Sequence, residues 1–262
     1  MEVLKTKVDK LEVRELSHSF SLDQREVLHR ISFTVKDGEF LSILGPSGCG
    51  KTTILRILIG LIQPSSGKIF KNGEDITEYK PSGRNMGIVF QNYALFQNMS
   101  VLGNVEYALK FNPGLKSRSR SIAENVIDQV GLTEHINKKP WKLSGGQQQR
   151  VAIARTLALN PEIILFDEPM SALDAATRLV LRDELKRIQE KFKSTMIYVT
   201  HDQEEAFALS DRIMVMNQGV IEQLDTPRNI VKNPASQYMK DFVIHNLKLK
   251  IDSLAQYMGA ED

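Results

Sequence analysis

The sequence predicts an α/β fold with a mostly parallel sheet, an N-terminal antiparallel β subdomain and an inserted helical subdomain. Apolar runs of strand length alternate with segments of helical periodicity, which is typical of a parallel sheet covered on both faces. Residues 11–35 instead hold two consecutive strand-like runs with only a polar turn between them, which indicates an antiparallel pair. Residues 92–160 are mostly helical in periodicity, which indicates an insertion.

The N-terminal elements follow from alternation and turn chemistry. LEVRELSHSF and VLHRISFTV are predicted to form the first two strands, and EFLSIL forms a third that runs directly into glycines. TTILRILIGLI has apolar residues at helical spacing and is broken by PSSG at residues 64–67. GKIFKNGEDI predicts a hairpin that turns at Asn72 and Gly73, and MGIVF predicts a buried strand.

The rest of the chain alternates between the two kinds of element. The clearest helices of the middle region are VLGNVEYALKF, SIAENVIDQVGL and QQQRVAIARTLAL. Strand signals return as EIILF, MIYVT and RIMVMNQGVIEQ, with LVLRDELKRIQEKF and QEEAFALS as helices between them. We therefore expect a core made of residues 1–91 and 161–234, a helical subdomain at 92–160, and a C-terminal extension of one or two helices at 235–262.

Composition excludes several classes of partner and compartment. The 34 Lys plus Arg nearly balance the 32 Asp plus Glu, giving a formal charge of +2, so no nucleic-acid partner is expected. Cys49 is the single cysteine, so no intrachain disulfide forms and a reducing cytoplasm is expected. The first ten residues, MEVLKTKVDK, lack the apolar core of a secretion signal. The apolar stretch Ile54–Ile62 is shorter than the roughly 20 residues of a spanning helix.

A glycine-rich loop follows the third strand and matches the pattern G-x-x-x-x-G-K-[ST]. It comprises Gly45, Pro46, Ser47, Gly48, Cys49, Gly50, Lys51 and Thr52, and Thr53 follows it. Glycines let successive backbone N–H groups turn toward phosphate oxygens, and the next helix adds the positive end of its dipole. Lys51 is expected to reach the β and γ phosphates of a bound nucleotide, and Thr52 to bind Mg²⁺. This motif predicts a phosphate-loop NTPase core, in which Cys49 is a tolerated small residue and not a redox switch.

Two carboxylates, Asp167 and Glu168, follow the apolar run IILF. Ligands of open α/β sheets bind at the carboxyl ends of such strands, and a buried carboxylate without a partner is costly. Asp167 is therefore predicted to bind Mg²⁺ directly or through water, and Glu168 to polarise the water that attacks the γ phosphate. The alternative is a solvated strand end followed by a turn at Pro169.

A second possible anion site lies at the start of another helix. Ser144 is a good N-cap, and the adjacent Gly145 and Gly146 suggest that something approaches the backbone closely. Together with Gln147 they lie in the predicted helical subdomain, remote from Lys51. Either the chain binds two anions, or this site completes a nucleotide held by another copy. Taken alone, the segment is weak evidence for a binding site, and a plain helix cap is the favoured interpretation.

The set GPSGCGKTT, LSGGQQQRVAIAR, IILFDEP, SALD and YVTHD, in this order and spacing, resembles the ATPase subunits of ATP-binding-cassette (ABC) transporters across nearly the whole chain. The resemblance implies that two subunits, identical or paired, stack head to tail and hold two ATP molecules. Each ATP lies between the phosphate loop of one subunit and the Ser144–Gln147 signature of the other. GRNMGIVFQNYALF and TPRNIVKNP are most similar to importers of polyamines, ferric iron, sulfate or phosphonates.

The resemblance also implies roles for four single residues. Gln91 is matched to a glutamine that touches Mg²⁺ or water, His201 to a histidine that bonds the γ phosphate, and Asp174 to a loop that crosses the dimer interface. Phe20 is matched to the aromatic side chain that stacks on adenine. A surface glutamine, a structural histidine, a helix N-cap and a core phenylalanine are the respective alternatives.

By the same resemblance, the partners are integral membrane permease subunits and an external substrate-binding protein, with the chain cytoplasmic and peripheral on the inner face of the cell membrane. The apolar segment 92–99 is either a docking surface for a permease helix or packing between subdomains. Gln97 and Met170 depart from the usual Pro and Leu of this branch. The sequence also stops where many relatives add a regulatory β domain, so regulation by such a domain is not expected.

Three other readings remain open. A soluble ABC-type ATPase acting on DNA or ribosomes would carry a long coiled coil or two cassettes, and neither is seen. A phosphate-loop GTPase would leave the signature unexplained, and the segment 137–140, NKKP, lacks the aspartate that reads guanine. A nucleotide-gated subunit without turnover would not need Glu168 and His201.

Overall fold

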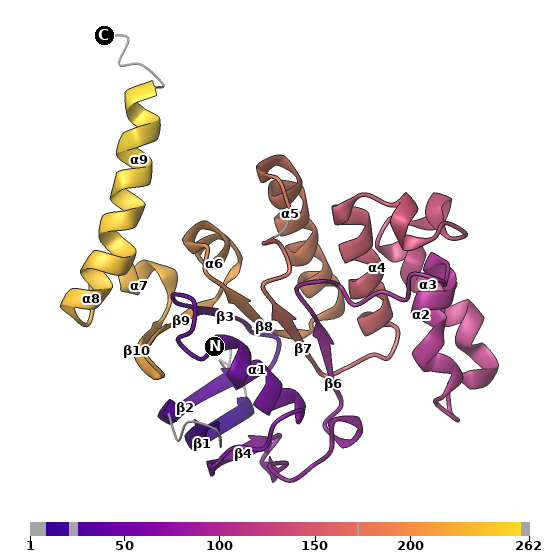
Figure 1. Ribbon diagram of the computed structural model, residues 1–262, viewed down its shortest axis with the longest axis horizontal. Coiled ribbons are helices and arrows are strands. Elements are labelled where there is room, and N and C mark those ends of the chain that lie inside the picture. The colour runs from indigo at the N-terminus through magenta and orange to yellow at the C-terminus, as the bar shows by residue number, and fades with distance from the viewer. Residues whose placement is uncertain (1–8, 21–25, 172, 258–262) are drawn as a thin grey trace, which may run out of the picture.

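The computed structural model describes residues 9–20, 26–171 and 173–257 and contains two sheets (Figure 1). The smaller is antiparallel, in the order β2 (Glu26–Lys36), β1 (Asp9–Ser19), β4 (Ser66–Lys71) and β5 (Glu74–Asp75). Its hairpin turns at Asn72 and Gly73, whose φ angles of 52° and 83° are those of a type I′ turn. The N-terminal antiparallel subdomain predicted from the sequence is therefore confirmed.

The larger sheet has six strands and is mostly parallel, as predicted. Only β10 (Val220–Asp225) runs antiparallel, on its neighbour β9 (Arg212–Asn217). The order then continues through β3 (Phe40–Leu44), β8 (Thr195–Thr200), β7 (Ile163–Asp167) and β6 (Met86–Val89). Every residue of β3, β7 and β8 is buried, because both faces of this sheet are covered.

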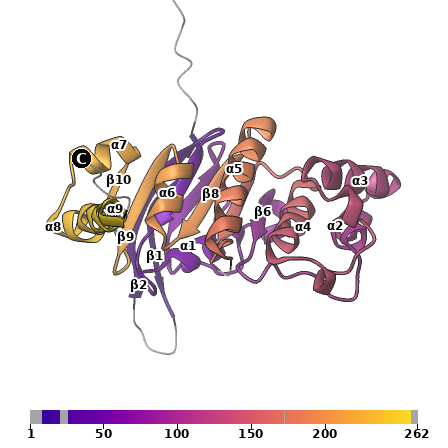
Figure 2. The same cartoon turned by 90° about the horizontal axis from the view of Figure 1, so that it is seen from above.

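Helices cover the two faces of this sheet with separate apolar clusters. One cluster joins α1 (Lys51–Ile59) and the antiparallel sheet to side chains such as Leu41 and Leu165. The other joins alternate side chains, such as Phe166 and Tyr198, to α5 (Ala175–Phe192) and to a group of helices at one end of the molecule (Figure 2). These are α2 (Val101–Lys110), α3 (Ser119–Gln129) and α4 (Gly145–Leu157). The division at residues 92 and 160 stays a prediction.

The remaining helices lie between α5 and the opposite end of the molecule (Figure 2). They are α6 (Gln203–Leu209), α7 (Pro227–Lys232), α8 (Gln237–Met239) and α9 (Asn246–Tyr257), with a π-helical turn at Lys240–His245 between the last two. Figure 1 shows α9 extending away from the sheets. Within the described residues, no helix combines the length and the apolar character needed to cross a bilayer.

One helix end and one whole helix illustrate where the structure departs from the sequence prediction. The helix after the glycine loop ends at Ile59 and not at Ile62, because Gly60 takes a left-handed conformation with φ of 86° and closes the last turn. Helix α7 was not predicted at all, although Thr226 caps it by accepting from Asn229 N and Pro227 occupies its first position.

A buried arginine fixes the far end of α1. Arg84 is fully buried, and its guanidinium donates to the carbonyl oxygens of Ile57 and Leu58 at 2.7 and 2.9 Å. It also bonds the carbonyls of Thr77 and Tyr79 at 2.6 and 2.9 Å. The last carbonyls of a helix lack partners within the helix, so Arg84 satisfies them and anchors α1 to the chain that leads into β6.

Candidate nucleotide-binding site

The glycine-rich loop connects β3 to α1 and leaves the N-terminus of that helix open. Gly50 is the N-cap, with φ of 104°, and no side chain caps the helix. A Cβ at Gly45 would lie 2.5 Å from the carbonyl oxygen of Met216, and one at Gly50 would lie 2.6 Å from Leu28. The loop is thus fixed by close backbone packing, and the start of α1 presents N–H groups and the positive dipole end without a side-chain acceptor.

Lys51 is folded over this loop. Its Nζ donates to the carbonyl oxygens of Gly45 and Pro46 at 2.8 and 2.9 Å, and it lies 3.8 Å from Glu168 Oε1. The residue is only 4% exposed. An ammonium group held between the loop and the acid pair is placed to contact the outer phosphates of a nucleotide bound on the loop.

The acid pair lies where the sequence predicted it, at the carboxyl end of β7. Asp167 is buried, and its Oδ1 accepts a hydrogen bond of 2.9 Å from the Thr52 hydroxyl. Burial raises the pKa of Asp167, and the Thr52 hydrogen bond offsets this only in part. The alternative of a freely solvated strand end is therefore wrong for Asp167.

Glu168 and His201 come together across neighbouring strands. β7 and β8 are parallel and pair Asp167 with Val199, so the residues that follow each strand meet at one edge of the sheet. Glu168 takes φ of 44°, and its Oε2 lies 3.0 Å from His201 Nδ1. His201 is 55% exposed at its side chain. The pair can accept a proton at Glu168 while the histidine remains accessible from solvent.

The Thr52 hydroxyl and the Asp167 carboxylate fit a magnesium ion, since Mg²⁺ prefers oxygen ligands and takes one or two from the protein and the rest from phosphates and water. In the described part of the chain, no group of three or more His, Cys, Asp or Glu is placed to hold a metal. Gln91, the third predicted ligand, does not join them. Its Nε2 donates to Ser171 Oγ at 3.1 Å, and Ser171 Oγ donates to the Glu168 carbonyl at 3.0 Å.

Ser171 was missed by the sequence reasoning. Its position three residues after Glu168 carries no chemical signal in the sequence, although the structure makes it the bridge between Gln91 and the acid pair. Gln91 itself is exposed, as the alternative reading expected. Its predicted role at the metal stays a prediction.

Phe20 borders a hollow next to the loop, and it is not a core residue. It is 45% exposed and packs edge-on against His18, with 4.8 Å between ring centroids. The hollow has a volume of about 330 Å³ and is lined by Phe20, Val27, Ser47, Gly48, Gly50, Lys51, Thr52, Thr53 and Glu168. An exposed aromatic face beside a phosphate-binding loop suits a nucleoside base.

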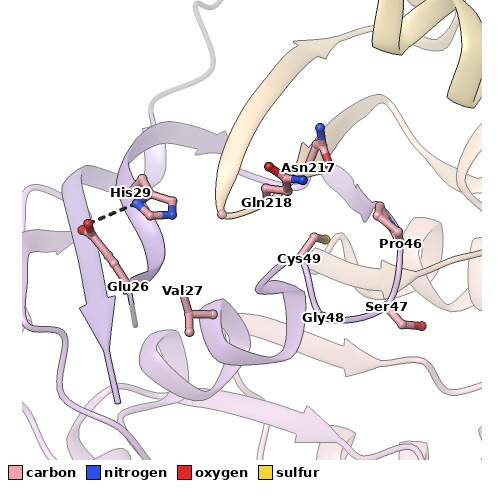
Figure 3. A pocket seen from close by; sticks show the side chains of 10 residues that line it. Glu26, Val27, His29, Pro46, Ser47, Gly48, Cys49, Asn217 and Gln218 are labelled. Carbon is pink, nitrogen blue, oxygen red and sulfur yellow. Dashed lines mark ion pairs between the residues drawn. The ribbon is translucent and has the colours of Figure 1, made fainter. Parts of the chain in front are cut away.

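A larger cavity of about 920 Å³ also borders the loop (Figure 3). It is bounded by Pro46–Cys49, by the turn at 217–219 between β9 and β10, and by the start of β2, where His29 and Glu26 form an ion pair of 3.1 Å. Cys49 is buried here, and burial raises the pKa of its thiol. A thiol that stays protonated is a packing residue, which agrees with the sequence interpretation.

The signature forms the N-terminus of α4. Ser144 Oγ accepts from Gln147 N at 3.4 Å and Ser144 N donates to Gln147 Oε1 at 3.0 Å, a complete capping box. A Cβ on Gly145 would lie 2.8 Å from Leu173, and one on Gly146 would lie 3.0 Å from Thr177. The side chains that approach these glycines thus belong to the same chain. Asp174 caps α5 by accepting from Thr177 N at 2.9 Å, so its N-cap reading is confirmed.

The two sites are separate within this chain. The hollow at Lys51 and the 330 Å³ pocket at Ser144 share no lining residue, and β6 lies between α1 and α4 in Figures 1 and 2. Segment 92–99 fits both interpretations, packing between subdomains and a docking surface. Tyr93 and Leu95 are buried, while Phe96 is 38% exposed.

Comparison with known proteins gives matches along most of the chain. The family pattern described as ABC transporter matches residues 28–171. The spermidine/putrescine import ATP-binding protein PotA of Marinobacter nauticus is 46% identical over 84% of this chain and 59% of its own length. The Fe(3+) ions import ATP-binding protein FbpC 2 of Rhizobium meliloti is 50% identical over 81% of this chain and 54% of its own length. The chain thus spans under two thirds of the length of these relatives.

Two solved structures share the fold. CbiO1 of Clostridium perfringens, part of the ABC transporter complex CbiONQ, superposes with a TM-score of 0.80 at 28% identity, over 95% of this chain and 98% of that one. A dimeric ATP-binding cassette in a post-hydrolysis state, bound to ADP and Pi, superposes with a TM-score of 0.73 at 34% identity, over 83% of this chain and 99% of that one.

Proposed function

Because the chain belongs to the ABC transporter family, we propose that it is the ATP-hydrolysing subunit of an importer. The observation that carries this proposal is the division of the nucleotide site. Lys51, the Thr52–Asp167 pair and the Glu168–His201 pair form one half around the phosphate loop. The second anion site, at Ser144, shares no lining residue with this half in the same chain, so a second copy facing it head to tail supplies the other half.

Each group of this half-site has a proposed role in ATP hydrolysis. The phosphate-loop N–H groups and Lys51 hold the β and γ phosphates, and Phe20 stacks on the adenine. Glu168 accepts a proton as water attacks the γ phosphorus, the bond to the ADP oxygen breaks, and that oxygen keeps the electron pair. His201 bonds the γ phosphate, and Gln91 joins when the site closes. Thr52 and Asp167 would hold a magnesium ion, which would supply positive charge to neutralise the phosphate oxygens.

ATP binding then closes the dimer, and closure moves the membrane partner. The exposed Phe96, on segment 92–99, is the proposed contact for a cytoplasmic helix of the permease, which places the chain at the inner face of the cell membrane. The names of the relatives support small cargo such as polyamines or ferric iron. An external substrate-binding protein would deliver the cargo to the permease.

Complementation between two inactive variants tests the shared site. Lys51→Ala removes the phosphate contact and Ser144→Arg blocks the signature, so each homodimer is expected to lack ATPase activity. In a mixed dimer both defects fall in one site and the other site is intact. An equal mixture should therefore regain roughly a quarter of wild-type activity, because half of the dimers are mixed and each has one working site. A mixture as inactive as its parents would overturn the proposal.

A further inference from the structure

The side-chain amide of Gln147 lies between two groups, and only one of them belongs to the signature. Its Oε1 accepts from Ser144 N at 3.0 Å, while its Nε2 lies 2.8 Å from Nε2 of His135. His135 is in the 3₁₀ turn Thr133–His135, which precedes the signature in the chain. The histidine therefore touches the capping box from outside it.

Hydrogen-bond chemistry fixes the state of this ring. Oε1 of Gln147 is needed as the acceptor for Ser144 N–H, so the amide NH₂ group faces the histidine and must donate. Nε2 of His135 must then offer a lone pair, and the hydrogen of the neutral ring is on Nδ1. Nδ1 is buried and has no hydrogen-bond partner among the described residues. Within the described residues, the Nε2 contact is therefore the one hydrogen bond of the ring.

We propose that His135 is a positioning residue for the signature, acting through Gln147; this rests on the proposed function. Without an acceptor at Nε2, the NH₂ group of Gln147 has no partner in the box, so the side chain can rotate out of the box to reach water and takes Oε1 away from the Ser144 N–H. The cap then opens, and Ser144 with the first N–H groups of α4 loses its fixed direction toward the phosphate of the partner's ATP. The neutral imidazole prevents this rotation.

The first test measures ATP-driven dimerisation in a Glu168→Gln background, where hydrolysis does not intervene. His135→Phe keeps a ring but removes the acceptor, whereas His135→Gln supplies an amide oxygen. The ATP concentration for half-maximal dimerisation should rise about fivefold with His135→Phe, the factor that one neutral hydrogen bond contributes, and stay within about twofold with His135→Gln. His245→Phe, at an exposed histidine of the C-terminal segment, is the matched control. Equal curves for His135→Phe and the control would refute the inference.

The second test asks on which subunit His135 acts. In one mixture Lys51→Ala/His135→Phe is combined with Ser144→Arg, so the only working site uses the altered signature. In the other, Lys51→Ala is combined with Ser144→Arg/His135→Phe, so the working site uses an intact signature. The KM for ATP should rise about fivefold in the first mixture alone, with kcat unchanged. Equal KM values would show a general structural effect and overturn the proposal.

The parent mixture of Lys51→Ala with Ser144→Arg separates the two claims. If it is inactive, the proposed function fails; if it is active and the two His135 mixtures do not differ, only the role of His135 fails.

A measurement on the unaltered protein covers the case in which the variants fail to fold. The chain has five histidines, few enough to resolve by ¹⁵N NMR after histidine labelling. The proposal requires the His135 ring to carry its hydrogen on Nδ1 and none on Nε2 at neutral pH. A ring with hydrogen on Nε2 would contradict it.

Discussion

The two helix N-termini that are proposed to receive phosphate are built in opposite ways. At α1 the cap is Gly50, no side chain closes the terminus, and the loop before it is wedged against backbone. At α4 the cap is Ser144, and Gln147 completes a box that satisfies two backbone N–H groups from within the chain.

The difference indicates that the two helix N-termini would engage phosphate at different steps. An open terminus has unsatisfied N–H groups and a dipole end, so it gains most from an anion and binds nucleotide first. A self-capped terminus gains little from an anion alone, so under the proposed function it would engage only when a second copy presents a phosphate already held at the phosphate loop. This order would prevent a single copy from hydrolysing ATP without a partner. Each of the following substitutions alters the site at the start of α1 or the site at the start of α4.

Glu168→Gln is expected to have the largest effect. The amide cannot accept the proton of the attacking water, so kcat should fall by about 10²–10³. Both termini remain intact, so ATP-dependent dimers should persist and accumulate. Steady-state phosphate release and sedimentation in Mg-ATP measure the two halves of this prediction.

Glu190→Gln, at an exposed position on α5, is the control and should leave both quantities unchanged. Full ATPase activity in Glu168→Gln would remove Glu168 from the mechanism.

Replacing one glycine of each loop by alanine should show how tightly the two loops are packed. At Gly45 the new Cβ meets the Met216 carbonyl oxygen at 2.5 Å, and backbone cannot yield cheaply; at Gly145 it meets the end of Leu173 at 2.8 Å, and a side chain can rotate. Overpacking predicts a loss of about 2–3 kcal/mol in the free energy of unfolding for Gly45→Ala and under about 1 kcal/mol for Gly145→Ala. Urea unfolding of both variants compares them, and equal losses would contradict the prediction.

Local chemistry explains what the sequence could predict. The phosphate loop was recognisable because a buried strand, glycines and a helix follow one another, and the acid pair because polar residues end an apolar run. The Asn72–Gly73 hairpin was predictable because that dipeptide favours positive φ at both turn positions. The sheet arrangement followed from the alternation of strands and helices.

Contacts between distant segments could not be predicted in this way. Ser171 joins Gln91 to the Glu168 carbonyl across 80 residues of chain, and His135 reaches Gln147 across 12. The two signature glycines implied a close approach, but not that Leu173 and Thr177 make it. Each of these depends on how α4, α5 and β6 pack, which no local pattern encodes.

Asp167→Asn should stabilise the nucleotide-free protein while removing its response to Mg-ATP. Burial raises the pKa of Asp167 in the folded state, so its contribution to folding is most favourable below the unfolded pKa of about 4 and is lost as pH rises through the folded value. At pH 7 the charged, buried group costs on the order of 1 kcal/mol, which Asn avoids while still accepting from Thr52.

The expected result is that the Tm of Asp167→Asn is about 2–4 °C higher than that of wild type at pH 7 and equal to it near pH 3.5. Calorimetry at the two pH values, with and without Mg-ATP, measures it. Glu190→Gln again serves as the control. A variant less stable than wild type at pH 7 would mean that the Asp167 charge is already compensated in the empty site.

Ser144→Ala should have the smallest effect on stability and tests whether the α4 cap serves mainly the partner. N-cap removal costs about 0.5–2 kcal/mol, and the 3.4 Å distance from Gln147 N to Ser144 Oγ puts this cap at the low end, since long hydrogen bonds are weak. Thr226→Ala, which removes the Oγ that accepts from Asn229 N at 3.2 Å at the start of α7, is the matched control. Both should lower the Tm by a similar small amount, but only Ser144→Ala should weaken ATP-dependent dimerisation. If the two variants dimerise alike, Ser144 is only a helix cap, and the contrast between an open and a self-capped terminus has no bearing on how two copies meet.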